Sequence, residues 1–234
     1  MKRILLALAG AFTITLSAST YAAEPLSFGV KVGPVNSTIM GLDKAKKATS
    51  EYKYFNPGVL GTAYVEYAVH ENIGLGLEAG YFFGKIGSFK PKNDKDNKNA
   101  YGITAHGVKI FPAIKFYPMG REDENGILKL HVGGDFYIPV AAEGKKEEGN
   151  DTAKKVDRKE LTTPFGMGVI GGIGYEFPFG LELDLRYSHA FTNVFTEDST
   201  FKKDELEITT KDDKTNLIGI NFAVGYNFAV LLEE

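Results

Sequence analysis

Residues 181–191, LELDLRYSHAF, hold the residue types in this chain that are most suited to chemistry. Charged side chains alternate with leucines, and Ser188 and His189 follow them. A serine beside a histidine is the combination that hydrolases use as nucleophile and base. Adjacent residues of a strand, however, point to opposite faces. Without a bulge the two side chains cannot form that pair, so we predict no catalytic residue and no enzymatic activity.

Metal and cofactor sites are also not predicted. The four histidines lie on four different predicted strands: His70, His106, His131 and His189. They show no HExxH spacing, and nothing brings metal ligands together. The stretch DKDNK (94–98) lacks the glycine and the closing glutamate of a calcium loop. The glycine-rich GVIGGIGYEF (168–177) is not followed by a helix, as a dinucleotide-binding loop requires.

Charges on alternate residues form a more extended pattern. Alternation of period two recurs along the chain and predicts β-strands with two different faces. We predict eight strands, at 26–40, 56–70, 73–87, 102–118, 127–141, 162–177, 180–195 and 215–229. One face of each strand is almost wholly apolar. The other face combines many glycines with charged residues, which are Lys31, Glu66, Glu78, Lys109, Lys115, Lys129, Asp135, Glu182, Asp184 and Arg186.

The two faces fit two kinds of barrel. A soluble lipocalin-like barrel would place the apolar face inside, whereas a membrane barrel would place it against lipid. Glycines on the charged face favour the membrane barrel, because a narrow eight-stranded barrel needs small residues inside. Aromatic residues near the strand ends of the apolar face also favour it, since they resemble interfacial girdles. The five cationic and five acidic side chains then face the lumen, where we expect them to form ion pairs around Arg186.

The connections alternate between long and short. Long polar stretches cover 41–55, 88–101, 142–161 and 196–214, while short ones lie near 71, 120–126 and 178–180. This alternation is typical of up-and-down barrels of the outer membrane. The sequence therefore predicts an all-β protein, a single eight-stranded antiparallel up-and-down transmembrane β-barrel, which we expect to be a monomer.

The beginning of the chain resembles an export signal. Lys2 and Arg3 precede an apolar run over 4–16, and small residues end at Ala22–Ala23. We therefore expect residues 1–23 to be a removed signal peptide and residues 24–234 to form the barrel domain. The chain has no cysteine, so disulfides do not stabilise it. Its net charge of −3 makes nucleic acid an improbable partner.

Several segments resemble the PorT-like family of bacterial outer-membrane β-barrels. They are FGVKVGPVNSTI (28–39), NPGVLGTAYVEYAV (56–69), LGLEAGYFFGKIG (75–87), VKIFPAIKFYP (108–118), LELDLRYSHAFTNV (181–194) and INFAVGYNF (220–228). The resemblance implies an outer-membrane location. Most such proteins have no defined activity, and one branch assists protein secretion. Barrels of this kind usually finish on an aromatic residue, whereas here AVLLEE follows Phe228.

Three functions remain open at this point. The first is a structural or surface-interaction barrel in outer-membrane lipid and lipopolysaccharide, which contacts host or surface molecules through loops 142–161 and 196–214. The second is an accessory role in outer-membrane assembly or protein secretion. The third is modification of lipid A, which the opposite facing of Ser188 and His189 disfavours. We expect no cofactor in any of these roles.

Overall fold

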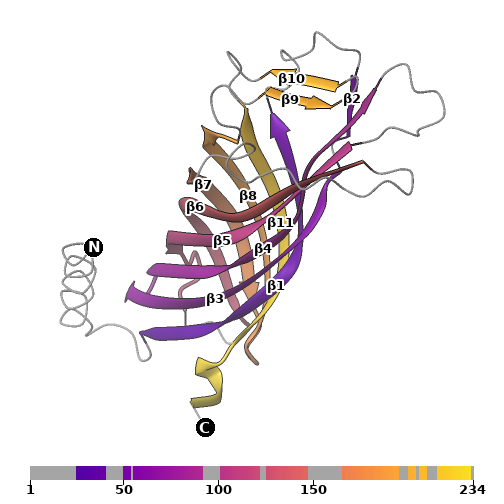
Figure 1. The fold of residues 1–234 in the computed structure, drawn as a ribbon. Coiled ribbons are helices and arrows are strands. Elements are labelled where there is room, and N and C mark those ends of the chain that lie inside the picture. Colours follow the sequence, from indigo (N-terminus) through magenta and orange to yellow (C-terminus); the bar gives the residue numbers. More distant parts are fainter. Residues whose placement is uncertain are drawn as a thin grey trace.

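The computed structural model describes residues 25–40, 50–53, 55–91, 101–121, 125–146, 165–194, 200–203, 206–209 and 215–232. Eight long strands dominate it (Figure 1): β1 (Leu26–Met40), β3 (Pro57–His70), β4 (Ile73–Pro91), β5 (Tyr101–Phe116), β6 (Ile127–Lys146), β7 (Gly166–Glu176), β8 (Leu181–Asn193) and β11 (Asn216–Asn227). Three short strands are β2 (Ser50–Lys53), β9 (Thr200–Lys203) and β10 (Leu206–Thr209). The 3-10 helix η1 (Ala229–Leu232) follows β11.

The long strands close into a barrel. Consecutive long strands pair in antiparallel fashion, and β1 pairs with both β3 and β11. Gly29, for example, lies opposite Tyr64 of β3 and opposite Asn227 of β11. The pairing of β4 with β5 completes the ring. The predicted eight-stranded antiparallel up-and-down barrel is thus confirmed.

The strand boundaries differ from the prediction at one end of the barrel. Residues 88–91, 101 and 142–146 were predicted to belong to connections, but they extend β4, β5 and β6. Ser88 lies opposite Gly102, and Ala105 lies opposite Ala142. The backbone ladder continues there after the alternation of side chains has faded, because the hydrogen bonds of a strand pair do not depend on side-chain polarity. The short strands β2, β9 and β10 were also not predicted.

The remaining parts of the long connections lie outside the described residues. Residues 1–23 of the predicted signal peptide also lie outside them. The short connections join β3 to β4, β5 to β6 and β7 to β8, all at one end of the barrel (Figure 1). We call this the short-turn end, and the opposite end the long-connection end. No helix in the described part of the chain has the length and apolarity to cross a bilayer.

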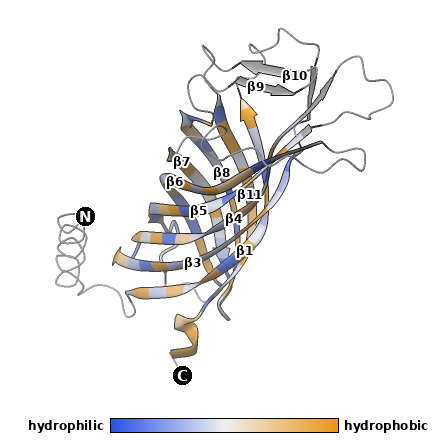
Figure 2. Ribbon diagram, in the orientation of Figure 1, coloured by the Kyte–Doolittle hydropathy of each residue, from blue (hydrophilic) through white to orange (hydrophobic). Residues whose placement is uncertain are grey.

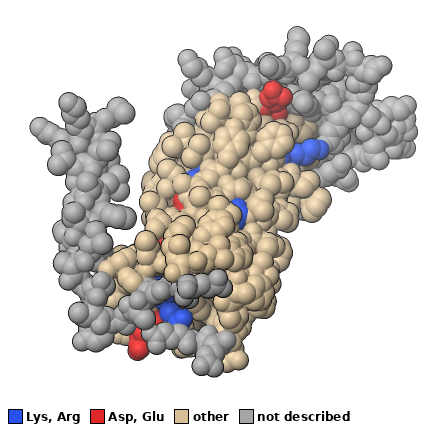
Figure 3. Space-filling model, turned by 90° about the horizontal axis from the view of Figure 1, so that it is seen from below, with Lys and Arg blue, Asp and Glu red and all other residues tan. Residues whose placement is uncertain are grey.

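The apolar face of the strands points outward and the charged face points inward. Val132, Leu185 and Ile220 are 61%, 48% and 55% exposed, whereas Lys129 and Glu182 are buried. Viewed from below, the described surface of the barrel shows few charged groups (Figure 3), and the ribbon alternates between apolar and polar residues (Figure 2). A soluble barrel would have the reverse arrangement, so the lipocalin-like alternative is excluded. The outer surface suits contact with lipid.

Candidate functional site: the charged lumen

The ten predicted charged side chains all lie in the lumen. They come from β1, β3, β4, β5, β6 and β8, and none is more than 9% exposed. Strand alternation aims every second residue inward, and the narrow bore of eight strands brings side chains from opposite walls together. Within this space the structure arranges them in two connected clusters and one separate pair.

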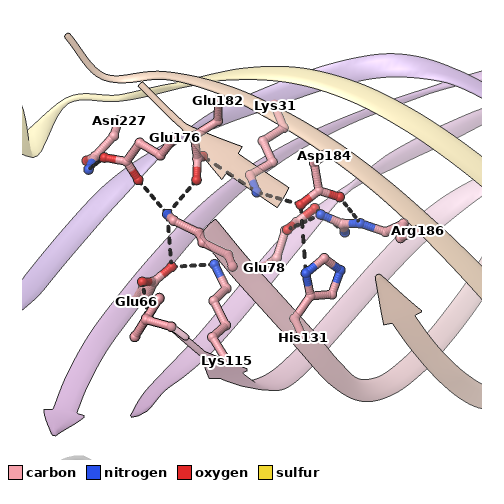
Figure 4. A network of polar contacts seen from close by, with 12 residues as sticks. Lys31, Glu66, Glu78, Lys115, His131, Glu176, Glu182, Asp184, Arg186 and Asn227 are labelled. Carbon is pink, nitrogen blue, oxygen red and sulfur yellow. Dashed lines mark hydrogen bonds and ion pairs between the residues drawn. The ribbon is translucent and has the colours of Figure 1, made fainter. Parts of the chain in front are cut away.

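The Arg186 cluster consists of Lys31, Glu78, Asp184 and Arg186 (Figure 4). The Arg186 guanidinium donates from Nη1 and Nη2 to the two carboxylate oxygens of Glu78, at 2.8 and 3.1 Å. Its Nε donates to Asp184 Oδ1 at 2.7 Å. Lys31 Nζ lies 3.1 Å from the other oxygen of Asp184. Arg186 therefore binds two carboxylates at once, in the bidentate geometry that only a guanidinium provides.

The Lys129 cluster lies closer to the short-turn end and consists of Glu66, Lys115, Lys129, Glu176 and Glu182. Figure 4 labels its other four members around the unlabelled Lys129 ammonium. The ammonium of Lys129 is 2.5 Å from Glu176, 2.6 Å from Glu182 and 3.7 Å from Glu66. Lys115 also pairs with Glu66. One lysine is thus shared by three carboxylates that are buried together with it.

Lys31 connects the two clusters, because its ammonium is also 3.5 Å from Glu182. Lys109 and Asp135 form the separate pair, with Lys109 Nζ at 2.8 Å from Asp135 Oδ2. The ammonium of Lys109 also lies over the rings of Phe111 and Tyr137. Removing such charges from water is costly, and these pairings offset that penalty.

The short-turn end of the network is closed by residues beyond the strands. Tyr117, directly after β5, donates its hydroxyl to Glu66, and Arg121 lies over the Tyr117 ring. Arg121 donates to the side chain of Ser27 at the start of β1. Burial, followed by the neighbouring Glu66 carboxylate, raises the pKa of the Tyr117 phenol. Tyr117 therefore stays neutral and remains a hydrogen-bond donor.

Some lumen residues were missed by the sequence analysis. Glu176 pairs with Lys129 and accepts a hydrogen bond from Asn227 at 2.7 Å. His131 lies beside the Arg186 cluster, with Nδ1 4.0 Å from Asp184. Both residues share the inward parity of their strands, which would have identified them. Glu176 lies at the end of β7, next to the β7–β8 turn.

A second missed feature is the apolar half of the lumen. Buried apolar side chains gather there: Val35, Ile39, Leu60, Phe82, Ile86, Ile103, Ala105, Phe111, Ala142 and Ile170. Most of them lie toward the long-connection end of their strands. A cavity of about 40 Å³ next to this cluster is bordered by Lys109, Asp135 and Ser188. The lumen therefore has a charged half and an apolar half, and both are filled by side chains.

No catalytic or metal-binding geometry is found in the described ranges. Ser188 borders the lumen cavity, whereas His189 interacts with Tyr187, whose hydroxyl lies 3.1 Å from the histidine Nδ1, and with the ring of Phe191. Tyr187 and Phe191 are exposed on the outer surface. The serine and the histidine thus face opposite sides of the wall. Among the described residues, no group of three His, Asp or Glu side chains could hold a metal ion.

A comparison with protein-family models agrees with this architecture. A family model described as outer membrane protein beta-barrel domain matches residues 17–196. None of the curated proteins matches the chain. Several solved structures are similar at low identity, and OprG, Neisserial surface protein A and Ail are among them. OprG from Pseudomonas aeruginosa is 15% identical, with 89% of this chain and 97% of that chain covered and a TM-score of 0.49.

Two further solved structures cover similar shares of the chain. Neisserial surface protein A is 12% identical, with 87% of this chain and 99% of that chain covered and a TM-score of 0.43. The attachment invasion locus protein Ail of Yersinia pestis is 11% identical, with 88% and 99% covered and a TM-score of 0.41.

Proposed function

The chain belongs to the outer membrane protein beta-barrel domain family, and from this premise we propose that it is a closed, non-enzymatic barrel of the bacterial outer membrane whose functional surface is its long connections. The barrel anchors the protein in lipid and lipopolysaccharide. Charged connections at the extracellular end contact host or surface molecules. The proposal takes the protein to act as a monomer and without a cofactor.

One observation carries the proposal: the lumen is filled. The ion-paired clusters occupy the half near the short turns, and apolar side chains occupy the other half. A pore for water-soluble solutes needs a continuous wet path, which barrels of 16 or more strands provide and an eight-stranded barrel filled by side chains does not. Transport through the lumen is therefore disfavoured, and the connections remain as the surface available for function.

Planar-bilayer recording tests the closed lumen. The purified full-length protein should show no steady ohmic conductance, because Arg186 and Lys129 hold the two clusters across the bore. A porin reconstituted by the same procedure serves as the positive control for insertion. Large and steady channel openings from the wild-type protein would replace the structural proposal with a porin.

Loop replacement tests the surface role. We expect that exchanging residues 148–160 for a short Gly-Ser linker abolishes binding of the protein to host-cell monolayers, because this stretch carries most of the charge of its connection. The matched control is the same exchange of residues 43–48, and this exchange should leave binding unchanged. Heat-dependent mobility in SDS gels verifies that each variant is still a folded barrel. Unchanged binding by the 148–160 variant would contradict the assignment of the surface to that connection.

An accessory role in assembly or secretion is the second candidate. It rests on the resemblance of segments such as 56–69 and 181–194 to the PorT-like family, in which one branch assists secretion. We propose membership in the PorT-like family as a finer assignment. Deletion of the whole protein should then deplete secreted proteins, whereas a purely adhesive barrel leaves secretion intact. Lipid A modification is disfavoured, since Ser188 and His189 lie on opposite faces.

A further inference from the structure

The chain forms a distinct apolar feature after its last strand. Beyond the proposed function, we propose that helix η1 and the β7–β8 turn form an interfacial anchor that inserts into the periplasmic leaflet of the outer membrane. In barrels of this class the short turns face the periplasm. The last strand therefore ends at the periplasmic rim, and η1 projects from that rim (Figure 1).

The anchor is fixed in place by specific contacts. The side chain of Asn227 accepts a hydrogen bond from the Ala229 amide at 3.0 Å and thereby caps the first turn of η1. The same side chain donates to Glu176 in the lumen at 2.7 Å. The backbone amide of Asn227 donates to the Gly180 carbonyl at 2.8 Å. Asn227 thus connects the position of η1 to the charged lumen and to the β7–β8 turn.

Gly180 makes room for the helix. Its φ of +86° is strained for residues with a side chain, and an added Cβ would lie 2.7 Å from Val230. Val230 therefore packs directly on the backbone of the β7–β8 turn. This close approach brings η1 against the turn that contains the exposed Phe179.

Helix η1 is coloured as hydrophobic in Figure 2, and the exposed residues of this feature are apolar. Leu231, Leu232 and Phe179 are 59%, 75% and 61% exposed. Single exposed apolar residues are ordinary on protein surfaces. Here the two exposed leucines follow Val230, which packs on Gly180, and Gly180 directly follows the exposed Phe179 in the chain.

Continuity with the lipid-facing wall identifies lipid as the occupant. The ring of Phe228 contacts Phe28 at 6.2 Å and Tyr226 at 5.5 Å between centroids, and the Phe228 amide donates to the Phe28 carbonyl at 2.8 Å. Phe28 belongs to the outward, lipid-facing side of β1. The exposed Leu231 and Leu232 follow Phe228 by three and four residues, so they continue the apolar sequence beyond the barrel wall. Apolar side chains next to an aromatic girdle favour the headgroup and acyl boundary over water.

The chain contains no tryptophan, so one introduced tryptophan reports on a single position. We would replace Leu232 with tryptophan and reconstitute the full chain into phosphatidylethanolamine and phosphatidylglycerol vesicles. The matched control is Glu71→Trp, an exposed position in the short β3–β4 turn at the same end. Emission from Leu232→Trp should be blue-shifted relative to Glu71→Trp and strongly quenched by lipids brominated near the headgroup. Acrylamide should quench mainly Glu71→Trp.

Two outcomes would overturn the proposal. Emission and acrylamide quenching equal to those of Glu71→Trp would show that η1 lies in water. Shielding that occurs in native outer-membrane vesicles, but not in pure lipid vesicles, would show that a protein partner covers the surface instead. Heat-dependent mobility in SDS gels establishes for each variant that the barrel is folded. Because loop binding is not measured, failure of the anchor leaves the proposed surface function standing.

Discussion

Replacement of Arg186 with methionine should lower the free energy of unfolding by about 3–5 kcal/mol, the range found when one partner of a buried ion pair is removed. The variant leaves the Glu78 carboxylate, which receives two hydrogen bonds from the guanidinium, without its cation. Asp184 loses one partner but keeps Lys31 at 3.1 Å. Urea unfolding in phospholipid vesicles, followed by circular dichroism, measures the loss.

A double variant separates ion pairing from packing. Glu78→Leu combined with Arg186→Met removes both partners and leaves no stranded charge, so it should recover most of the stability lost in the single variant. Arg186→Lys keeps the charge but loses the bidentate fork, and it should fall between wild type and Arg186→Met. If Arg186→Met were as stable as wild type, the lumen would contain enough water to solvate Glu78.

Replacement of Lys129 with methionine should have an effect at the upper end of the same range, on the order of 5 kcal/mol. Lys129 is shared by Glu66, Glu176 and Glu182, and its loss leaves those carboxylates with an excess of negative charge. Lys115 and Lys31 compensate only in part, because they pair with Glu66 and Glu182 whereas Glu176 pairs with Lys129. The midpoint of urea unfolding at neutral pH is the measurement.

Lys109→Met provides the matched comparison on the same side of the barrel. It strands only Asp135, which borders the lumen cavity, so we expect a smaller loss of about 1–3 kcal/mol. Equal losses from Lys129→Met and Lys109→Met would mean that the number of shared carboxylates does not determine the stability of the lumen.

The strands and the inward residues could be predicted because the period of a strand is fixed at two. Once Leu183 and Leu185 were assigned to one face, Glu182, Asp184 and Arg186 had to occupy the other. The partners could not be predicted in the same way. Arg186 pairs with Glu78 from β4, on a distant part of the ring, and such a pairing depends on the shear and tilt of the closed barrel.

The apolar half of the lumen could not be predicted from alternation either. Leu60, Phe82 and Phe111 break the polar pattern of the inward face, but hydrophobicity alone does not show that they meet. Their contacts arise from the pairing of β3 with β4 and from the curvature of the wall. The extensions of β4, β5 and β6 could not be predicted either, because backbone hydrogen bonding there continues beyond the residues that show the alternating side-chain pattern.

The long sequence separations within the charged clusters have a consequence for folding kinetics. Lys31 and Asp184 are 153 residues apart, and Glu78 and Arg186 are 108 apart. These contacts form only when strands that are far apart in the sequence meet. The entropic cost of closing the intervening chain must be met before the contacts can form. Interactions absent from the transition state retard unfolding far more than they accelerate folding. We therefore expect the charged clusters to lower the unfolding rate of the barrel strongly and to change its folding rate little.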